Sequence, residues 1–133
     1  VLFDQYLVFY NKDSDVDMHK EYLRERMMNN EAAVFAALGD QQELIGFALI
    51  YSTFSSTRLS KIDILNDLFV TPGSRKGGVG AALISSCVAH SQQNGAAFLR
   101  LRTAVNNTQA QGLYCKMGFV RDEAFYTYNH GLS

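Results

Sequence analysis

The 133-residue chain has few of the residues that stabilise small secreted proteins or bind metals: two cysteines, one proline and no tryptophan. Cys87 and Cys115 lack metal or redox spacing, so we expect no metal site and interpret both as free thiols of a cytoplasmic protein. No apolar run approaches the roughly 20 residues that span a bilayer, which argues against a membrane protein. The apolar start, "VLFDQYLVFYNKD", contains Asp4 and lacks a basic region and a cleavage site, so we do not expect a signal peptide.

A surplus of charge of either sign is also missing, since 12 basic residues face 13 acidic ones and the net charge is −1. This balance argues against a nucleic-acid partner. The distribution is uneven: residues 1–57 hold nine acids and four bases (net −5), whereas residues 58–121 hold eight bases and two acids (net +6). The two halves suit partners of opposite charge, although ordinary solvated faces explain the same pattern.

What is present is the composition of one globular domain, with 47% hydrophobic and 19% charged residues. Hydrophobic periodicity predicts a mixture of helices and strands, including a hairpin made by "AAVFAAL" and "LIGFALIYSTF". In chain order we expect helices over 2–10 and 18–30, strands over 32–38, 44–54 and 62–70, a helix over 80–94, a strand over 96–105, a helix from Asn107 to Gly118, and strands over 119–122 and 125–129.

A glycine-rich segment, "FVTPGSRKGGVGAAL", follows the third expected strand and leads into a helix. A Walker loop is excluded because no Gly-Lys-Ser/Thr is present. A dinucleotide fingerprint is poor because Leu83 replaces its third glycine and the next strand offers arginines instead of an acid. Arg-x-x-Gly-x-Gly fits Arg75 to Gly80, where the N–H groups of a helix start can hold an anion. A plain glycine turn is the alternative.

A second segment, "NTQAQGLYCKMGF", begins at Asn107 after the next expected strand. With both segments in place, nearly the whole chain resembles the GNAT superfamily of acetyl-CoA-dependent N-acetyltransferases. The resemblance implies a single N-acetyltransferase domain over 1–133 with an α/β (α+β) fold, in which helices flank a central mixed, mostly antiparallel sheet. The given sequence begins inside the family's first helix, so we expect the family's first strand either to be absent or to lie outside the given sequence. A homodimer in which a second copy covers the resulting edge is one arrangement that this absence permits.

The resemblance also assigns residues to acetyl-CoA, the expected cosubstrate. The strand end pairs with the pantetheine arm, the loop binds the pyrophosphate, and Asn107 contacts the arm. These assignments fall on Leu68, Phe69, Val70, Arg75, Lys76, Gly77, Gly78, Val79, Gly80, Ala81, Asn107, Ala110 and Tyr114. In the family, the tyrosine at the position of Tyr114 protonates the departing thiolate.

The expected chemistry is direct attack of an amine on the thioester, with no metal. A tyrosine with a pKa of about 10 is protonated at neutral pH, so Tyr114 can act as the acid. A lysine-like amine must lose a proton first, and Asp67 or Asp63 on the third strand is the candidate base, working through water. Exposed carboxylates or ion pairs with Lys61 or Arg58 explain the two acids equally well. A backbone N–H near Phe69 or Val70 is expected to stabilise the oxygen that becomes negative.

The acceptor amine is less constrained by the sequence. The acidic, aromatic opening is similar to the branch that includes diamine, polyamine and small histone acetyltransferases. It suits a small cationic primary amine, such as a polyamine or a lysine side chain. The alternatives are an aminoglycoside-like antibiotic, a protein N-terminus, or a CoA-binding sensor or inactive GNAT-fold module that acetylates nothing.

Overall fold

The structure is a computed structural model that describes residues 14–75 and 77–133. The helix expected over 2–10 and the loop residue Lys76 lie outside the described residues. The chain forms two compact units, Val1–Arg102 and Thr103–Ser133.

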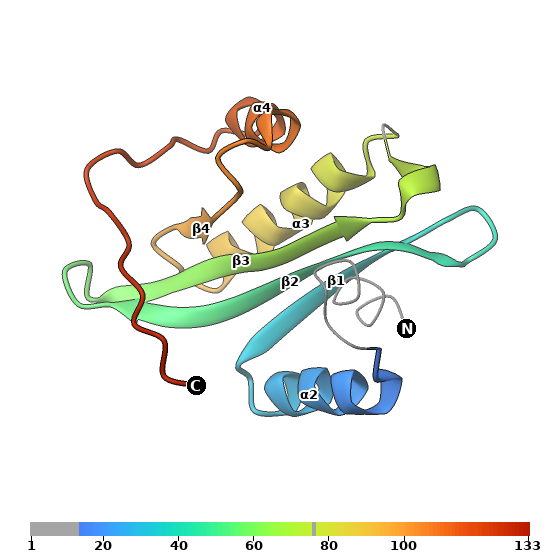
Figure 1. The fold of residues 1–133 in the computed structure, drawn as a ribbon, viewed down its shortest axis with the longest axis horizontal. Coiled ribbons are helices and arrows are strands. Elements are labelled where there is room, and N and C mark those ends of the chain that lie inside the picture. Colours follow the sequence, from blue (N-terminus) through green and yellow to red (C-terminus); the bar gives the residue numbers. More distant parts are fainter. Residues whose placement is uncertain (1–13, 76) are drawn as a thin grey trace. The chain divides into compact units, whose positions relative to one another are not determined.

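The first unit holds a four-stranded sheet with the order β1-β2-β3-β4 (Figure 1). The first three strands are antiparallel to one another, and β4 is parallel to β3. The expected mixed, mostly antiparallel sheet is therefore confirmed. Its elements in chain order are α2 (Val16–Met28), β1 (Ala32–Leu38), β2 (Leu44–Ser55), β3 (Ser60–Val70), a 3₁₀ turn (Pro72–Ser74), α3 (Val79–Gln93) and β4 (Leu99–Leu101).

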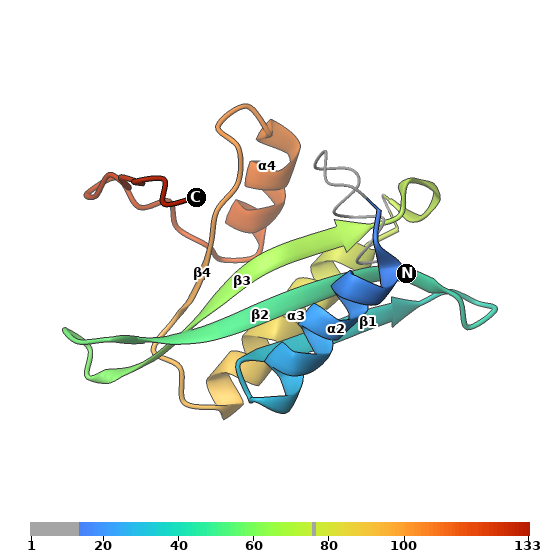
Figure 2. The ribbon, with the colours of Figure 1, turned by 60° about the horizontal axis from the view of Figure 1, so that its bottom comes forward.

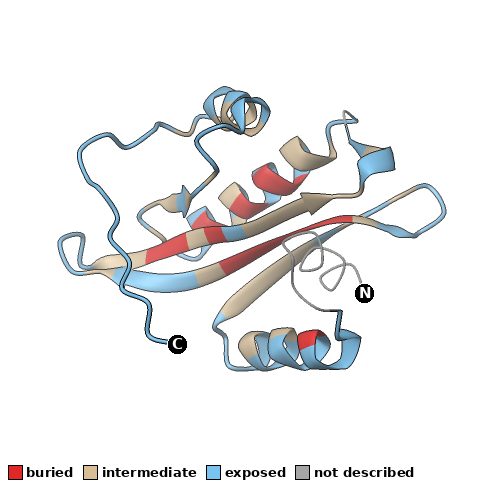
Figure 3. Cartoon of the chain, viewed as in Figure 1, coloured by how far each residue is buried: buried red, intermediate tan, exposed pale blue. Residues whose placement is uncertain are grey.

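The helices α2 and α3 cover opposite faces of this sheet (Figures 1 and 2). On the face toward α2, Phe47 and Leu49 pack with Leu23. On the face toward α3, alternate residues of β2 such as Ala48 and Ile50 are buried. Figure 3 shows that the buried residues concentrate along β2, β3 and α3. The core of the unit is thus the β2–β3 pair with α3 packed against it.

The helix α2 begins at Val16, two residues before the predicted start, because the Asp15 side chain caps it by accepting a hydrogen bond from the Met18 N–H at 3.0 Å. The spacing of its apolar residues predicts that Met18, Tyr22 and Met28 face the core, and this prediction is wrong. Met18, Tyr22 and Met28 are 59%, 44% and 70% exposed, whereas His19 is 8% exposed. The helix therefore meets the sheet with a partly polar face.

A β-bulge in β3 fixes which side chains lie on each face of the sheet. Leu49 pairs with Asp67 and Ile50 pairs with Leu65, so Asn66 is an extra residue without an opposite partner. An extra residue reverses the alternation of side chains. Asp63 therefore lies on the α3 face and Asp67 on the α2 face, although a spacing of four positions would place both on one face of a regular strand.

Two sequence predictions about strands are corrected. The strand expected over 96–105 forms only at Leu99–Leu101, because β4 leaves β3 after that point. The strands expected over 119–122 and 125–129 do not form. Phe119 is partly buried, but the other apolar side chains of these segments are solvent-exposed, including Phe125 at 82%. Strand propensity reflects packing on a pleated, half-buried surface, and no described strand pairs with this segment.

The second unit is built around α4 (Thr108–Lys116). Asn107 caps the helix by accepting a hydrogen bond from the Ala110 N–H at 3.2 Å. Gly118 ends it with a φ of 95°, a left-handed conformation that favours glycine. Both boundaries agree with the sequence prediction.

Candidate active site

The last five residues of β3 have one open edge. The parallel pairing with β4 covers only Asp63 to Leu65, so residues 66–70 have no strand partner on that side in the part of the chain that the structure describes. The Thr71 N–H donates to Ile45 O on the β2 side at 2.8 Å. Because alternate residues of a strand point to opposite edges, the N–H groups of Leu68 and Val70 point to the open edge.

Arg75 lies at the end of this open edge. Its Nε donates to Val70 O at 2.9 Å, and its guanidinium carbon is 5.8 Å from the centre of the Phe69 ring. The side chain is exposed. A cation is therefore held beside the open strand edge, with its terminal nitrogens available to an anion.

The glycine loop leads directly into α3. Gly78 is the N-cap and has a φ of 81°, which a residue with a side chain rarely adopts. The first helical hydrogen bond runs from Ala82 N–H to Gly78 O, so the N–H groups of Val79, Gly80 and Ala81 precede it. No described side chain caps this end, and a Cβ placed on Gly78 would meet no atom within 4 Å. The start of α3 therefore has backbone N–H groups that can donate hydrogen bonds to an anion.

Asp67 is the carboxylate nearest the open edge. It is partly exposed, and its Oδ2 accepts a hydrogen bond from Asn66 Nδ2 at 3.0 Å. Its neighbour on the same face along β3 is Phe69, which pairs with Phe47. In the described ranges, Asp67 forms no ion pair with Lys61 or Arg58. The carboxylate can therefore receive a cation from solvent on the α2 face.

Asp63 has a different environment and cannot serve as a solvent-facing base. Its side chain is fully buried and accepts hydrogen bonds from Ser52 Oγ at 2.8 Å and Ser91 Oγ at 2.6 Å. These bonds link β3 to β2 and to α3. Burial, and to a lesser degree the Asp63 charge, raise the pKa of the Cys87 thiol to about 11, so this cysteine stays protonated at neutral pH.

We expect Asp63→Ala to lower the free energy of unfolding by about 2–4 kcal/mol, because the buried Ser91 hydroxyl loses its acceptor and a cavity replaces the carboxylate. Urea unfolding measures the loss. Asp63→Asn is the matched control, since it retains the shape and one acceptor oxygen and should cost less. Equal stability of Asp63→Ala and the wild type would contradict this structural role.

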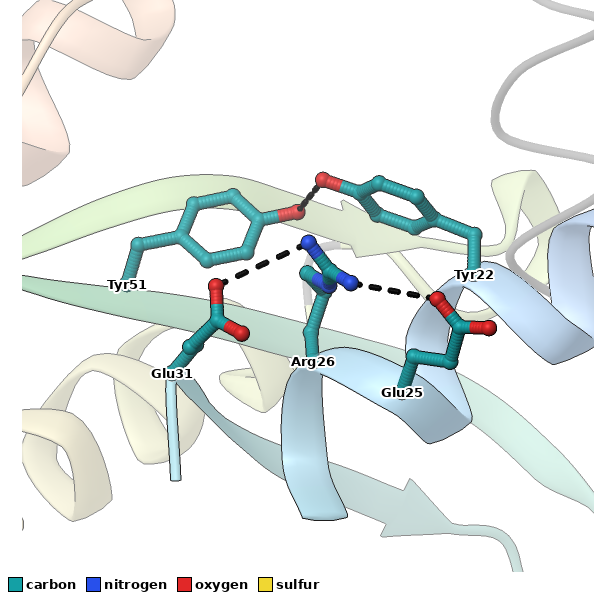
Figure 4. Close-up of polar contacts among 5 residues, drawn as sticks. All are labelled: Tyr22, Glu25, Arg26, Glu31 and Tyr51. Atoms are coloured by element: carbon teal, nitrogen blue, oxygen red, sulfur yellow. Dashed lines mark hydrogen bonds and ion pairs between the residues drawn. The ribbon is translucent and has the colours of Figure 1, made fainter. Parts of the chain in front are cut away.

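A second polar cluster, which sequence reasoning missed, lies between α2 and the sheet (Figure 4). The hydroxyls of Tyr22 and Tyr51 are 2.7 Å apart. Arg26 lies 5.5 Å from the Tyr22 ring centre and forms ion pairs with Glu25 at 3.2 Å and Glu31 at 3.6 Å. Tyr22 and Tyr51 are 29 residues apart in the sequence, so only the fold reveals their pairing.

The remaining predicted site residues belong to the second unit. Asn107 uses Oδ1 for the helix cap, and the Ala110 N–H is its donor. Tyr114 packs edge-on against Phe119, with ring centres 6.0 Å apart, and its carbonyl accepts from the Phe119 N–H at 2.9 Å. In the first unit, the predicted site residues thus lie along the end of β3, the glycine loop and the start of α3. In the second unit, they lie at the start of α4 and along that helix.

Comparisons with known proteins identify the class. The acetyltransferase (GNAT) family matches residues 2–119. The uncharacterized N-acetyltransferase YhfO of Bacillus subtilis (strain 168) is 40% identical over 127 residues, which cover 96% of this chain and 85% of the relative. An aminoglycoside N(6')-acetyltransferase type 1 of Stenotrophomonas maltophilia is 30% identical, covering 82% of this chain and 73% of the relative.

The fold comparison agrees. The crystal structure of a probable acetyltransferase is similar with a TM-score of 0.91 and 32% identity, covering 99% of this chain and 88% of that one. The chain belongs to the GNAT family of acetyltransferases. It is therefore an acetyltransferase, and its family generally uses acetyl-CoA.

Residues 14–75 and 77–133 contain neither a candidate metal centre nor a helix that could span a membrane. No three His, Cys, Asp or Glu side chains gather as they would around a metal ion. Every described helix is too short or too polar to cross a bilayer.

Proposed function

We propose that the protein transfers an acetyl group from acetyl-CoA to a small cationic primary amine, such as a polyamine or a lysine-like amine. The observation that supports this most directly is the open edge of β3, which continues through Arg75 into the uncapped start of α3. The open strand edge offers backbone hydrogen-bond partners to an extended, amide-containing arm, and the helix start offers donors to a diphosphate. A CoA thioester contains both of these groups.

The residues fit that ligand. The pantetheine arm would pair with the edge at Leu68 and Val70, whose N–H groups face away from β2. The diphosphate would lie on the N–H groups of Val79, Gly80 and Ala81, where the helix dipole favours negative charge. Arg75 and the sequence neighbour Lys76 would add positive charge at the loop. The bound thioester supplies the activated acetyl group.

Three groups of this chain would carry the proton and charge chemistry. The Val70 or Leu68 N–H would donate to the carbonyl oxygen as it gains negative charge. Asp67 would accept the proton of the incoming ammonium, directly or through water. Tyr114 would donate its proton to the sulfur as the thiolate leaves.

A cationic acceptor is favoured by charge. Residues 1–57 carry a net charge of −5, and Asp67 faces the side of the sheet on which α2 lies. Carboxylates near a site raise the local concentration of cations and leave neutral amines unaffected. An aminoglycoside-like acceptor is the second candidate, because a relative with 30% identity is named for that activity.

We expect spermidine-like amines to show a higher kcat/KM than neutral amines, with a preference that shrinks as salt rises. The screening length falls from about 10 Å at 0.1 M to about 3 Å at 1 M ionic strength. The measurement is thiol release from acetyl-CoA with a panel of polyamines, lysine peptides, an aminoglycoside and neutral amines. Equal use of cationic and neutral amines at low salt would contradict the proposed acceptor. Acetyl-CoA binding without transfer to any amine would favour a CoA-binding module.

A further inference from the structure

A hydrogen bond between the hydroxyls of Tyr22 and Tyr51 holds the Tyr51 side chain in position on the sheet. Tyr51 extends from β2 and Tyr22 from α2, and their oxygens meet at 2.7 Å (Figure 4). One hydroxyl must donate to the other. Whichever donates, each oxygen has two lone pairs and the shared bond uses only one of the four, so the Tyr51 oxygen still has a lone pair that can accept a hydrogen bond.

Tyr51 and Asp67 are neighbours on the same face of the sheet. Asp67 pairs with Leu49, and Tyr51 is two residues from Leu49 on β2. Such diagonal positions on adjacent strands are within reach of aromatic side chains. Their electrostatic coupling agrees with this placement: burial, the Tyr22 hydrogen bond and the Asp67 charge together raise the pKa of Tyr51 above its usual value. Tyr51 is therefore a neutral phenol beside a carboxylate.

The bulge at Asn66 creates this juxtaposition. Without the extra residue, Asp67 would lie on the α3 face with Asp63. Bulges often redirect a side chain next to an active site. Here the bulge places Asp67 beside Tyr51, two residues along the strand from Phe69 at the open edge.

Arg26, the cation of this cluster, is already balanced. It forms ion pairs with Glu25 at 3.2 Å and Glu31 at 3.6 Å. The two glutamates thus balance the Arg26 charge, so Arg26 does not neutralise the Asp67 carboxylate on the same face of the sheet. Arg75 is a further guanidinium on this face, but it lies at Phe69 and donates to Val70 O.

We propose that Tyr51 is a specificity-determining residue for the acceptor, and that its hydroxyl oxygen accepts a hydrogen bond from the ammonium group whose charge Asp67 balances. This inference rests on the proposed function. Of the three ammonium protons, Asp67 takes one and Tyr51 accepts a hydrogen bond from a second. The nitrogen that has given up its proton then keeps a fixed orientation, with its lone pair free for attack. Tyr22 holds the Tyr51 hydroxyl in place and has no direct contact with the amine.

The test is Tyr51→Phe, which removes the hydroxyl and keeps the ring. A hydrogen bond from a charged donor contributes more than one from a neutral donor. For amines that are protonated at the assay pH, we expect kcat/KM to fall roughly 10-fold or more. For amines that are uncharged at that pH, we expect a fall of only a few-fold. The loss should appear mainly in the KM of the amine, with the KM of acetyl-CoA unchanged. Tyr22→Phe should lower the ratio of cationic to neutral kcat/KM less than Tyr51→Phe does, because Tyr51 keeps its own hydroxyl.

The matched control is Thr53→Val, which removes a hydroxyl from the same face of the same strand, two residues further from Asp67. It should leave the ratio of cationic to neutral kcat/KM unchanged. If Tyr51→Phe shows no folded state in a thermal melt, Tyr22→Phe is the deciding variant. Tyr22 is 44% exposed, so the fold should tolerate the change. Loss of its hydroxyl releases the Tyr51 hydroxyl and should still lower the ratio measurably. An unchanged ratio in the decisive variant overturns the role of Tyr51 while the proposed function stands. A wild-type enzyme that acetylates no amine overturns both.

Discussion

Tyr114→Phe is expected to lower turnover by about 10²–10⁴-fold, the usual contribution of a general acid, with little change in acetyl-CoA affinity. The variant removes one oxygen and keeps the ring, so the edge-on contact with Phe119 at 6.0 Å is retained. The caps at Asn107 and Gly118, which define α4, do not involve the hydroxyl. The variant therefore keeps this ring contact and both caps.

Single-turnover thiol release with saturating amine measures the effect on the chemical step. Tyr126→Phe is the control, since Tyr126 is 90% exposed and lies in the same unit. It should retain wild-type turnover. If Tyr114→Phe also retains it, water or another group protonates the thiolate and Tyr114 is only a packing residue.

Elements defined by local signals were predictable from the sequence. Asp15 and Asn107 have side chains that cap helix starts, and Gly95 and Gly118 adopt the positive φ values that follow helix ends. The β1–β2 hairpin formed because both strands carry long apolar runs around a polar turn. These features depend on residues that are close in the chain.

Features that depend on pairing between distant residues were not predictable. The bulge at Asn66 is a property of the β2–β3 register, and nothing in "IDILNDLFV" marks Asn66 as the unpaired residue. Sequence alternation alone places Asp63 and Asp67 on one face. The register separates them, which leaves Asp63 fully buried and Asp67 partly exposed.

The strand predictions near the C-terminus failed for a related reason. "FVRD" and "FYTYN" have the aromatic and branched residues that strands favour. A strand needs a neighbour for its backbone groups, and composition does not report whether one is present. The contact between Tyr22 and Tyr51 was missed likewise, because Tyr22 was assigned to the apolar side of α2 and not to a polar contact.

Gly80→Glu is expected to abolish the stabilisation of the protein by acetyl-CoA. Gly80 lies in the first turn of α3, where its N–H precedes the first helical hydrogen bond. A glutamate there adds a side chain and a negative charge at the proposed diphosphate position. The fold should tolerate the substitution, because a negative charge in the first turn of a helix interacts favourably with the helix dipole. The variant therefore separates loss of binding from loss of folding.

Thermal melting with and without ligand measures this effect. For the wild type, acetyl-CoA at 100 times its Kd should contribute about 2.7 kcal/mol, a rise in Tm of roughly 5–10 °C. Gly80→Glu should show no rise at the same concentration. Gly80→Gln is the matched control, because glutamine is similar in size to glutamate but uncharged. It hinders the diphosphate sterically without repelling its charge, so it should keep part of the Tm shift. A full Tm shift in Gly80→Glu would place the diphosphate elsewhere and would remove the glycine loop from the active site.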